Sequence, residues 1–219
     1  MSFVKLRVHD VWSAAAFFGV LSLGFAQSAM ANTLCVNPGG TSGCYTTIGA
    51  AMTAAAAGDT INVGPGQYTE DVVVSKPLTL AGSGTNATII NAKGLANGIY
   101  VNGLDNGGLS GVTVAGFTVM NANFEGILLT DTSYSLIANN RVVNNNQSLN
   151  FAAASCPGLP IFETSEGMDC GEGIHLVGVH HTTVANNVSE LNSGGMLISD
   201  ETGMTYANNI TGNSIQDNA

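Results

Sequence analysis

The sequence predicts an all-β solenoid of short parallel strands, and three observations lead to this fold class. Only 9% of the 219 residues are charged, while Gly, Asn, Thr and Val are abundant, a composition that favours strands and tight turns over helix bundles. A short motif recurs with constant internal spacing. Within each copy, apolar and polar residues alternate, which indicates strands with one buried face. The length allows one domain or at most two.

The recurring motif has Gly at its first position, Ile or Met at its second, any residue at its third, and Leu or Ile at its fourth. Ala-Asn-Asn begins twelve residues after the Gly. Copies begin at Gly126, Gly173 and Gly195, and a looser copy begins at Gly98. The step from Gly173 to Gly195 is 22 residues, and the step from Gly126 to Gly173 is 47, one repeat plus a 25-residue insertion. A unit of this size cannot bury its apolar face alone, so it must stack on copies of itself.

Stacking the copies predicts two interior rows and a column of turn asparagines. Asn tolerates the left-handed conformation that a tight turn needs, and stacked Asn amides can hydrogen-bond along the solenoid axis. The predicted rows are Ile127, Ile174 and Met196, then Leu129, Leu176 and Ile198, with the Asn-Asn pairs at 139–140, 186–187 and 208–209 in the turns.

The N-terminal part has its own pattern. An Ala-rich stretch at 45–57, predicted to be helical, ends at Gly58, and apolar segments follow at 58–63, 65–68, 72–74 and 76–82. Together with the 22-residue unit, residues 35–219 resemble the right-handed parallel β-helices of the pectin-lyase-like superfamily. The unit itself is similar to the repeats of its periplasmic copper-protein maturation and carbohydrate-binding members. The resemblance implies a right-handed parallel β-helix over 59–219, with a short N-terminal capping helix within 32–58.

Residues 1–31 have the pattern of a secretory signal peptide. Lys5 and Arg7 precede an apolar run at 11–25, and Ala29-Met30-Ala31 has the small-x-small form of a cleavage site. The alternative is a membrane anchor, but the run is shorter than the roughly 20 residues that a spanning helix needs. We expect a mature chain that starts at Asn32, has no membrane span, and is periplasmic or extracellular.

The expected mature chain carries three Lys or Arg residues and fourteen carboxylates, a formal charge of −11. This charge argues against nucleic acid as a partner, because nucleic-acid binding depends on Lys and Arg at phosphates. The four cysteines predict disulfides in an exported protein. Of the three possible pairings we favour the local pairs Cys35–Cys44 and Cys156–Cys170. A metal site at Cys170 and His175 is the alternative, without C-x-x-C spacing to support it.

Between the interior positions, one residue of each repeat points outward, which gives the row Tyr100, Leu128, His175 and Leu197. The insertion, at about 149–172, enters just before the His175 strand and should overhang the same face. A loop that overhangs a flat sheet makes a groove. In the polysaccharide-active β-helices that this chain resembles, the substrate lies along such a groove, so the resemblance implies a polysaccharide or cell-surface glycan as partner.

Cleavage of a glycan would need a carboxylic acid and a carboxylate on either side of the bond. Asp200 or Glu201, opposite Glu172 or Asp169, would supply them. Carboxylates in the insertion would also suit Ca²⁺, which takes oxygen ligands. The candidate residues are catalytic Asp200, Glu172 and His175; substrate-binding Tyr100, His180, Glu201 and Asp131; and Ca²⁺-binding Glu163, Glu166 and Asp169.

Each candidate also has a simpler interpretation. Tyr100 and His175 would be ordinary exposed residues, Asp131 and Asp200 would terminate strands, and the insertion's carboxylates would be solvated. A pectate-lyase-like activity is disfavoured because Arg141, the one arginine after the predicted signal peptide, lies away from the proposed groove.

Two functions therefore stay open, a secreted polysaccharide hydrolase or lyase and a non-catalytic surface, adhesion or glycan-binding scaffold. Because the repeat pattern runs to Ala219 without a polar cap, we expect further C-terminal coils or a capping partner.

Overall fold

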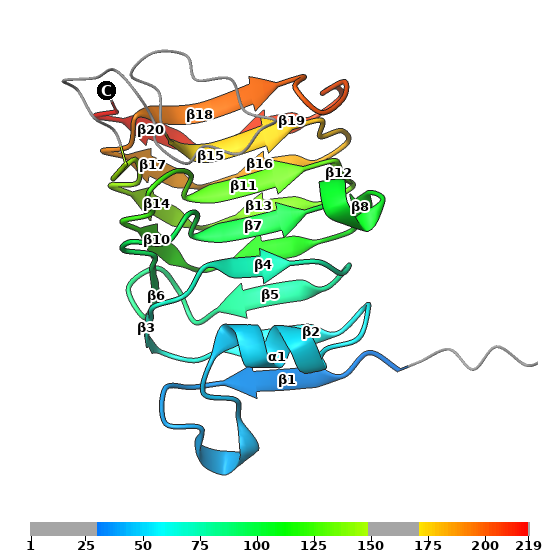
Figure 1. The fold of residues 1–219 in the computed structure, drawn as a ribbon, viewed down its shortest axis with the longest axis vertical. Helices are drawn as coiled ribbons and strands as arrows, with labels where there is room; N and C mark the ends of the chain where they lie inside the picture. Colours follow the sequence, from blue (N-terminus) through cyan, green and yellow to red (C-terminus); the bar gives the residue numbers. More distant parts are fainter. Residues whose placement is uncertain (1–29, 149–170, 219) are drawn as a thin grey trace, which may run out of the picture. The chain divides into compact units, whose positions relative to one another are not determined.

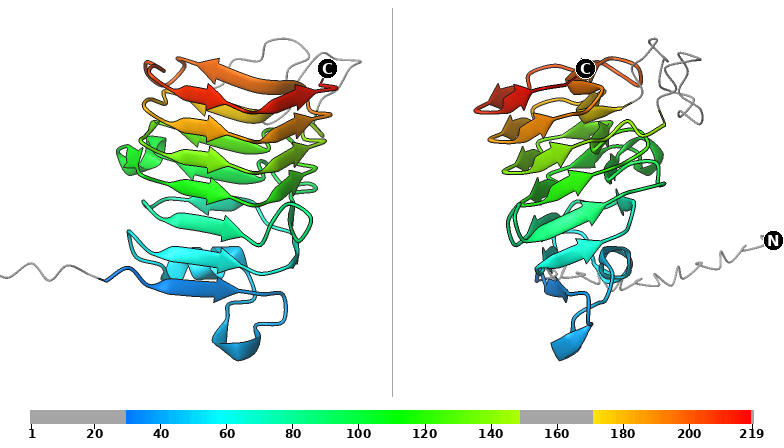
Figure 2. Two further views of the ribbon diagram at one scale, coloured as in Figure 1. Left: turned by 180° about the vertical axis from the view of Figure 1, so that it is seen from behind. Right: turned by 90° about the vertical axis from the view of Figure 1, so that its left-hand side faces the viewer.

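The chain winds into a parallel β-helix, as Figure 1 shows for the computed structural model, which describes residues 30–148 and 171–218. All the strand pairs of its sheets are parallel, and partners come from successive coils rather than from neighbouring segments of one coil. The coils lie in sequence order from the N-terminal end upward (Figure 2). The predicted all-β solenoid is confirmed. No helix among the described residues is long and apolar enough to cross a membrane.

Three long sheets and one short sheet form the sides of the coil. Sheet A contains β1 (Thr33–Val36), β2 (Thr60–Val63), β5 (Thr79–Gly82), β9 (Thr113–Ala115), β13 (Leu136–Ala138), β16 (Thr183–Ala185) and β19 (Asn209–Thr211). Sheet B contains β3 (Gly66–Tyr68), β6 (Thr88–Asn91), β10 (Thr118–Met120), β14 (Arg141–Val143), β17 (Val188–Glu190) and β20 (Ser214–Gln216). Sheet C contains β4 (Val72–Val74), β7 (Ile99–Asn102), β11 (Ile127–Thr130), β15 (Glu172–Val177) and β18 (Gly194–Ser199), and sheet D contains β8 (Leu109–Ser110) and β12 (Thr132–Ser133).

Rows of aliphatic side chains fill the interior. Ile127 pairs with Ile174, which pairs with Met196, and Leu129 pairs with Leu176, which pairs with Ile198, in the register that the repeat predicts. The first two members of each row are fully buried, whereas in the last coil Met196 is half-buried and Ile198 is 48% exposed. The strands of sheet A supply a second wall of fully buried residues, Ile61, Leu80, Val114, Ile137 and Val184. At about 25 cal/mol per Å² of apolar surface removed from water, these rows are the main favourable term in folding.

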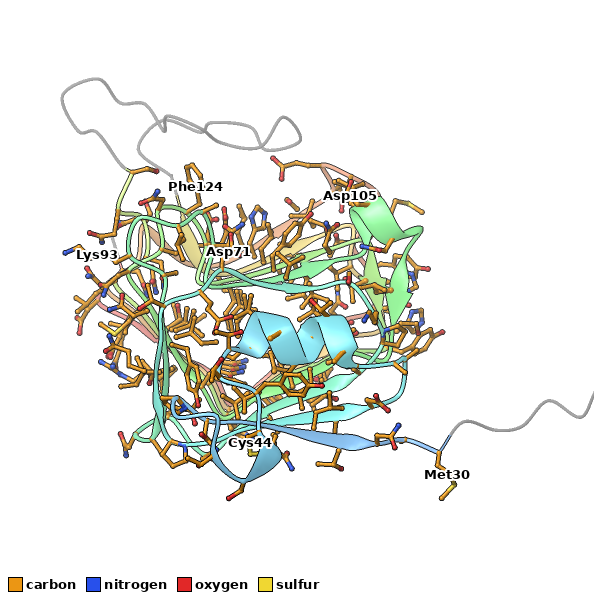
Figure 3. All side chains as sticks on the ribbon, turned by 60° about the horizontal axis from the view of Figure 1, so that its bottom comes forward. Met30, Cys44, Asp71, Lys93, Asp105 and Phe124 are labelled. Carbon is orange, nitrogen blue, oxygen red and sulfur yellow. A yellow bond between two sulfur atoms is a disulfide. The ribbon has the colours of Figure 1, made fainter. Side chains whose placement is uncertain are left out.

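Helix α1 (Ile48–Ala54) lies at the N-terminal end of the coils, across the side chains that fill the interior (Figure 3). It is shorter than the predicted stretch at 45–57, because the backbone is already extended at Ala55. Ile48, Ala51 and Met52 face the interior and are buried. Thr47 caps the first turn, and Glu70 accepts hydrogen bonds from the Ile48 and Gly49 amides. The helix therefore closes the apolar end of the stack.

Strand β1 precedes this helix and extends sheet A by one strand. The prediction placed these residues in the N-terminal cap segment and gave no strand there. Two short 3-10 turns, Thr41–Gly43 and Leu104–Asn106, complete the elements of the described residues. The predicted disulfide Cys35–Cys44 is present and closes the loop between β1 and α1. Residues 1–29 of the predicted signal peptide and Cys156 and Cys170 lie outside the described residues.

A steric constraint explains why each repeat opens with glycine. A Cβ on Gly173 would lie 1.9 Å from the Ser189 hydroxyl and 2.8 Å from the Asn192 amide nitrogen. The chain passes so close to sheet B at this corner that no side chain fits. The same approach recurs in the other coils, where Gly98, Gly126 and Gly195 face Val119, Val142 and Ile215.

Asparagine ladders join the coils along the corners on either side of sheet B. Asn187 is representative: its Oδ1 accepts the backbone N–H of Asn140 at 3.0 Å, and its Nδ2 donates to the Ile137 carbonyl at 2.9 Å. Because the side chain satisfies backbone groups of the neighbouring coil, it fixes the turn without water. The two ladders are Asn140, Asn187 and Asn213, and Asn145, Asn192 and Asn218.

The predicted register of the third Asn-Asn pair is wrong. Ala185 pairs with Thr211, not with Ala207, because the last coil has four more residues in the turn between β18 and β19 than the repeat implies. Asn208 instead accepts the amide of Thr182, in a column that begins at Ser135. The register of the strands in sheet C matches the prediction, because the four extra residues come after β18.

Replacement of Asn187 by Ala tests the ladder. It leaves the Asn140 amide and the Ile137 carbonyl buried without their side-chain partners, and each such loss costs about 1–3 kcal/mol. We expect the free energy of unfolding to fall by about 2–5 kcal/mol, measured by urea denaturation. Asn186→Gly is the matched control: Asn186 is exposed with φ 56, so Gly should change stability by less than about 1 kcal/mol. Equal effects of the two changes would contradict the ladder's role.

Candidate functional site

The predicted outward row exists in the register that the sequence indicated. Tyr100 pairs with Leu128, Leu128 with His175, and His175 with Leu197 across β7, β11, β15 and β18. The two middle residues of the row are not open to solvent, however, while Tyr100 and Leu197 are partly exposed. His175 is 3% exposed and Leu128 is fully buried, so the interpretation of His175 as an ordinary exposed residue is wrong.

His175 is surrounded by carboxylates on both sides of its ring. Its Nδ1 lies 3.4 Å from a Glu172 oxygen and 3.8 Å from a Glu125 oxygen. Its Nε2 lies 3.0 Å from the Ser199 hydroxyl and 3.7 Å from a Glu201 oxygen. We call these five residues the His175 cluster. Three members were predicted as site residues, and the fold brings them together.

Glu125 and Ser199 were missed by the sequence analysis, although a signal for Glu125 exists. Glu-Gly-Ile occurs at 125–127 and again at 172–174. Because Ile127 and Ile174 are neighbours across the coils, the two preceding glutamates lie one above the other. Like charges in adjacent strands oppose each other, so a pair at this position is costly unless something compensates it.

Tyr100 lies two coils before His175 in the same outward row and is partly exposed. Its hydroxyl lies 3.2 Å from the hydroxyl of Thr130, on the next coil. This contact fixes the ring of Tyr100 on the outer face of sheet C.

Asp131 and Asp200 have bonds that suit the ends of strands. Asp131 has φ 44 and accepts the Thr202 hydroxyl at 2.7 Å, and Asp200 accepts the Thr205 amide at 2.8 Å. Asp200 is exposed, and the carboxylate that reaches the His175 ring is its neighbour Glu201. The catalytic role predicted for Asp200 and the substrate role predicted for Asp131 stay predictions.

His180 is half-buried and belongs to a group of four rings, the other three exposed, at the corner before sheet A. The ring of Tyr134 stacks on His181 with centroids 4.9 Å apart, and His180 stacks on Tyr206 at 4.9 Å. The two histidine Nδ1 atoms lie 3.0 Å apart. We call Tyr134, His180, His181 and Tyr206 the aromatic ridge. Its members come from three successive coils, and Tyr134 is 63% and Tyr206 48% exposed.

The ridge uses an unusual backbone conformation. Tyr134 and His181 have φ angles of 49° and 52°, in the left-handed region that bulky residues rarely adopt. The adjacent coil places Gly111 at this corner, with φ 77. Strain of this kind costs on the order of 1–3 kcal/mol and collects at functional sites.

A pocket among the described residues lies elsewhere, between α1 and β4. It has a volume of about 430 Å³ and contains none of the predicted site residues. Burial raises the pKa of the Asp71 carboxyl, which lines this pocket, and the Asn97 amide opposes the shift. The predicted Ca²⁺ ligands Glu163, Glu166 and Asp169 lie outside the described residues.

Asp71 should make stability depend on pH. Because the pKa of Asp71 is raised on folding, its contribution is fully present below the unfolded pKa of about 4 and is lost as pH rises through the folded pKa. We therefore expect Asp71→Asn to raise Tm at pH 7 and to have little effect at pH 4, measured by circular dichroism. Asp217→Asn, at an exposed position, is the control. A Tm gain for Asp71→Asn that is the same at both pH values would contradict this account.

Comparison with known proteins identifies the family. The family described as the right handed beta helix region matches residues 79–219. The chain belongs to this family. The match confirms the predicted right-handed parallel β-helix, whose coils are those of sheets A to D. No curated protein sequence matches the chain.

Solved structures share the β-helix at low sequence identity. Geobacillus virus E2 ORF18 has a TM-score of 0.52 and 15% identity, over 74% of this chain and 37% of that one. A pectin methylesterase in complex with a hexasaccharide has a TM-score of 0.47 and 11% identity, over 74% and 56%. Pectate lyase Pel9A has 0.47 and 14%, over 76% and 49%. The chain spans less than two thirds of each of these structures, and the likeness concerns the fold.

Proposed function

We propose that this β-helix is an exported polysaccharide-binding protein whose aromatic ridge contacts the sugar chain. The observation that carries the proposal is a group of four stacked rings from three successive coils at one corner, of which Tyr134, His181 and Tyr206 are exposed and His180 is half-buried. Exposed aromatic rings offer apolar faces beside polar groups, and the C–H face of a pyranose ring packs on such a surface. Coils about 4.8 Å apart repeat at a distance comparable to one sugar unit, so an extended glycan can run along the axis.

The backbone at the ridge supports a role beyond packing. Tyr134 and His181 adopt φ angles that favour glycine, and Tyr134 is mostly exposed. Stability alone gives no reason to hold a tyrosine there, because glycine would fit without strain.

Charge favours a neutral glycan. With a net charge of −10 on the full sequence, the protein repels polyuronates and other polyanions over a distance that salt only partly screens. Export is supported by the signal-peptide pattern of residues 1–31 and by the Cys35–Cys44 disulfide, because disulfides persist in oxidising compartments.

Tyr134→Gly tests the ridge. The change relieves backbone strain of about 1–2 kcal/mol and loses ring stacking of about 0.5–1.5 kcal/mol, so stability should stay near that of the wild type. Binding to a panel of neutral glycans, measured by glycan array and then by calorimetry, should weaken at least tenfold. Tyr206→Ala should weaken binding similarly.

Leu191→Gly is the matched control, because Leu191 is also exposed, at 55%, with φ 56. It should leave glycan affinity unchanged. If the wild-type protein binds no glycan, or if Tyr134→Gly binds as well as the wild type, the ridge is not a glycan site and the scaffold alternative is favoured.

Cleavage of the bound glycan is a second candidate, favoured by one observation: the Glu201 carboxylate is partly exposed, at 18%, and lies 3.7 Å from Nε2 of His175. Release of reducing ends from a glycan that binds, abolished by Glu201→Gln, would support this activity. A glycan that binds and stays intact would leave binding as the function.

A further inference from the structure

We propose that Glu125, Glu172 and His175 form a site for a divalent transition-metal ion, of the class represented by Zn²⁺. The site is separate from the aromatic ridge, so its test does not depend on glycan binding at the ridge. All three residues are at most 4% exposed, and one potential ligand atom from each lies within 4.8 Å of the others.

The spacing of these atoms suits an ion between them. Nδ1 of His175 lies 3.4 Å from Glu172 and 3.8 Å from Glu125. A charge-assisted hydrogen bond would draw such atoms to about 2.7–2.9 Å. Ligands about 2.1 Å from a tetrahedral Zn²⁺ lie about 3.4 Å from each other. The observed separations are therefore close to those of a coordination shell.

The opposite side of the His175 ring has the contacts that a metal-binding histidine needs. Nε2 lies 3.0 Å from Ser199 Oγ, and that hydroxyl donates to Glu201 at 2.8 Å. A histidine that ligates a metal through one nitrogen commonly gives its other N–H to an oxygen, which fixes the ring and its tautomer. Ser199 and Glu201 hold Nδ1 directed toward the two glutamates.

The chain's charge distribution also favours a bound cation. From Asn32 on, the sequence has three Lys or Arg residues, and they are placed elsewhere. Lys76 donates to carbonyls at the end of α1, Arg141 pairs with Glu190 on sheet B, and Lys93 is exposed after β6. Two buried carboxylates in neighbouring coils repel each other, and a divalent ion between them would reduce this repulsion.

The donor set selects the class of ion. One imidazole nitrogen with two carboxylates suits Zn²⁺ and neighbouring first-row metals. Ca²⁺ prefers six to eight oxygen ligands, so it should bind this site weakly. An ion here would connect two adjacent coils, because Glu125 lies just before β11 and Glu172 is the first residue of β15. The two coils are 47 residues apart along the chain, as counted from Gly126 to Gly173.

The experiment measures Zn²⁺ binding to the full chain after chelator treatment. We expect one Zn²⁺ per chain by mass spectrometry of bound metal, a rise in Tm on addition of Zn²⁺, and little effect of Ca²⁺. Substitution with Co²⁺ should give visible d–d absorption that reports nitrogen and oxygen ligands. Glu125→Gln and His175→Gln should weaken Zn²⁺ affinity at least tenfold, and Glu201→Gln by about 10- to 100-fold.

Glu125→Gln separates the metal site from a purely structural cluster. Without a metal, Zn²⁺ should change the Tm of neither the wild type nor Glu125→Gln, whatever the variant's own stability. With a metal, the variant loses the Tm gain that Zn²⁺ gives the wild type. Far-UV circular dichroism checks that each variant is folded.

Glu190→Gln is the control on sheet B, and it should bind Zn²⁺ as the wild type does. Failure of the wild type to bind Zn²⁺, or equal binding by the wild type, Glu125→Gln and His175→Gln, would overturn the proposal.

Discussion

The whole structure depends on the stacking of one coil against the next. A single coil exposes an apolar face and unpaired backbone groups, and only a neighbouring coil in register can cover both. The aliphatic rows fix the separation and the asparagine ladders fix the corners, since each Asn187-type amide bonds backbone groups of an adjacent turn. Residues far apart in sequence, such as Glu125 and Glu172, become neighbours because of this register alone.

Much of this register could be predicted from the sequence. The position of Ile174 above Ile127 follows from the spacing of the repeat, because the motif has the same internal spacing on both sides of the insertion. The error at Ala207 shows the limit. Four extra residues between β18 and β19 shift the corner, while Ala-Asn-Asn by chance repeats at the expected offset. In an asparagine-rich chain, a short Asn motif does not identify its ladder.

The candidate site was less predictable, for physical reasons that particular residues show. The alternation placed His175 correctly on the outer face, but alternation says which way a side chain points and not whether something covers it. Burial of His175 and Leu128 therefore could not be inferred. The aromatic ridge combines turn residues from three coils, and only His180 was singled out, because turns carry no periodic signal that marks their side chains.

The His175 cluster and the aromatic ridge share one property: each contains residues that go against the local preferences of the chain. In the repeat motif, local preference and global packing agree: glycine opens each repeat where no Cβ fits, and asparagine occupies turns that need left-handed backbone. Tyr134 goes against those preferences because its backbone has a left-handed φ that bulky residues rarely adopt. Glu125 and Glu172 go against them because two like charges lie close together on adjacent coils. Natural sequences keep such conflicts mainly where function compensates for them. A ring held outward and a buried set of nitrogen and oxygen donors are both arrangements that a ligand can stabilise and that the fold alone does not require.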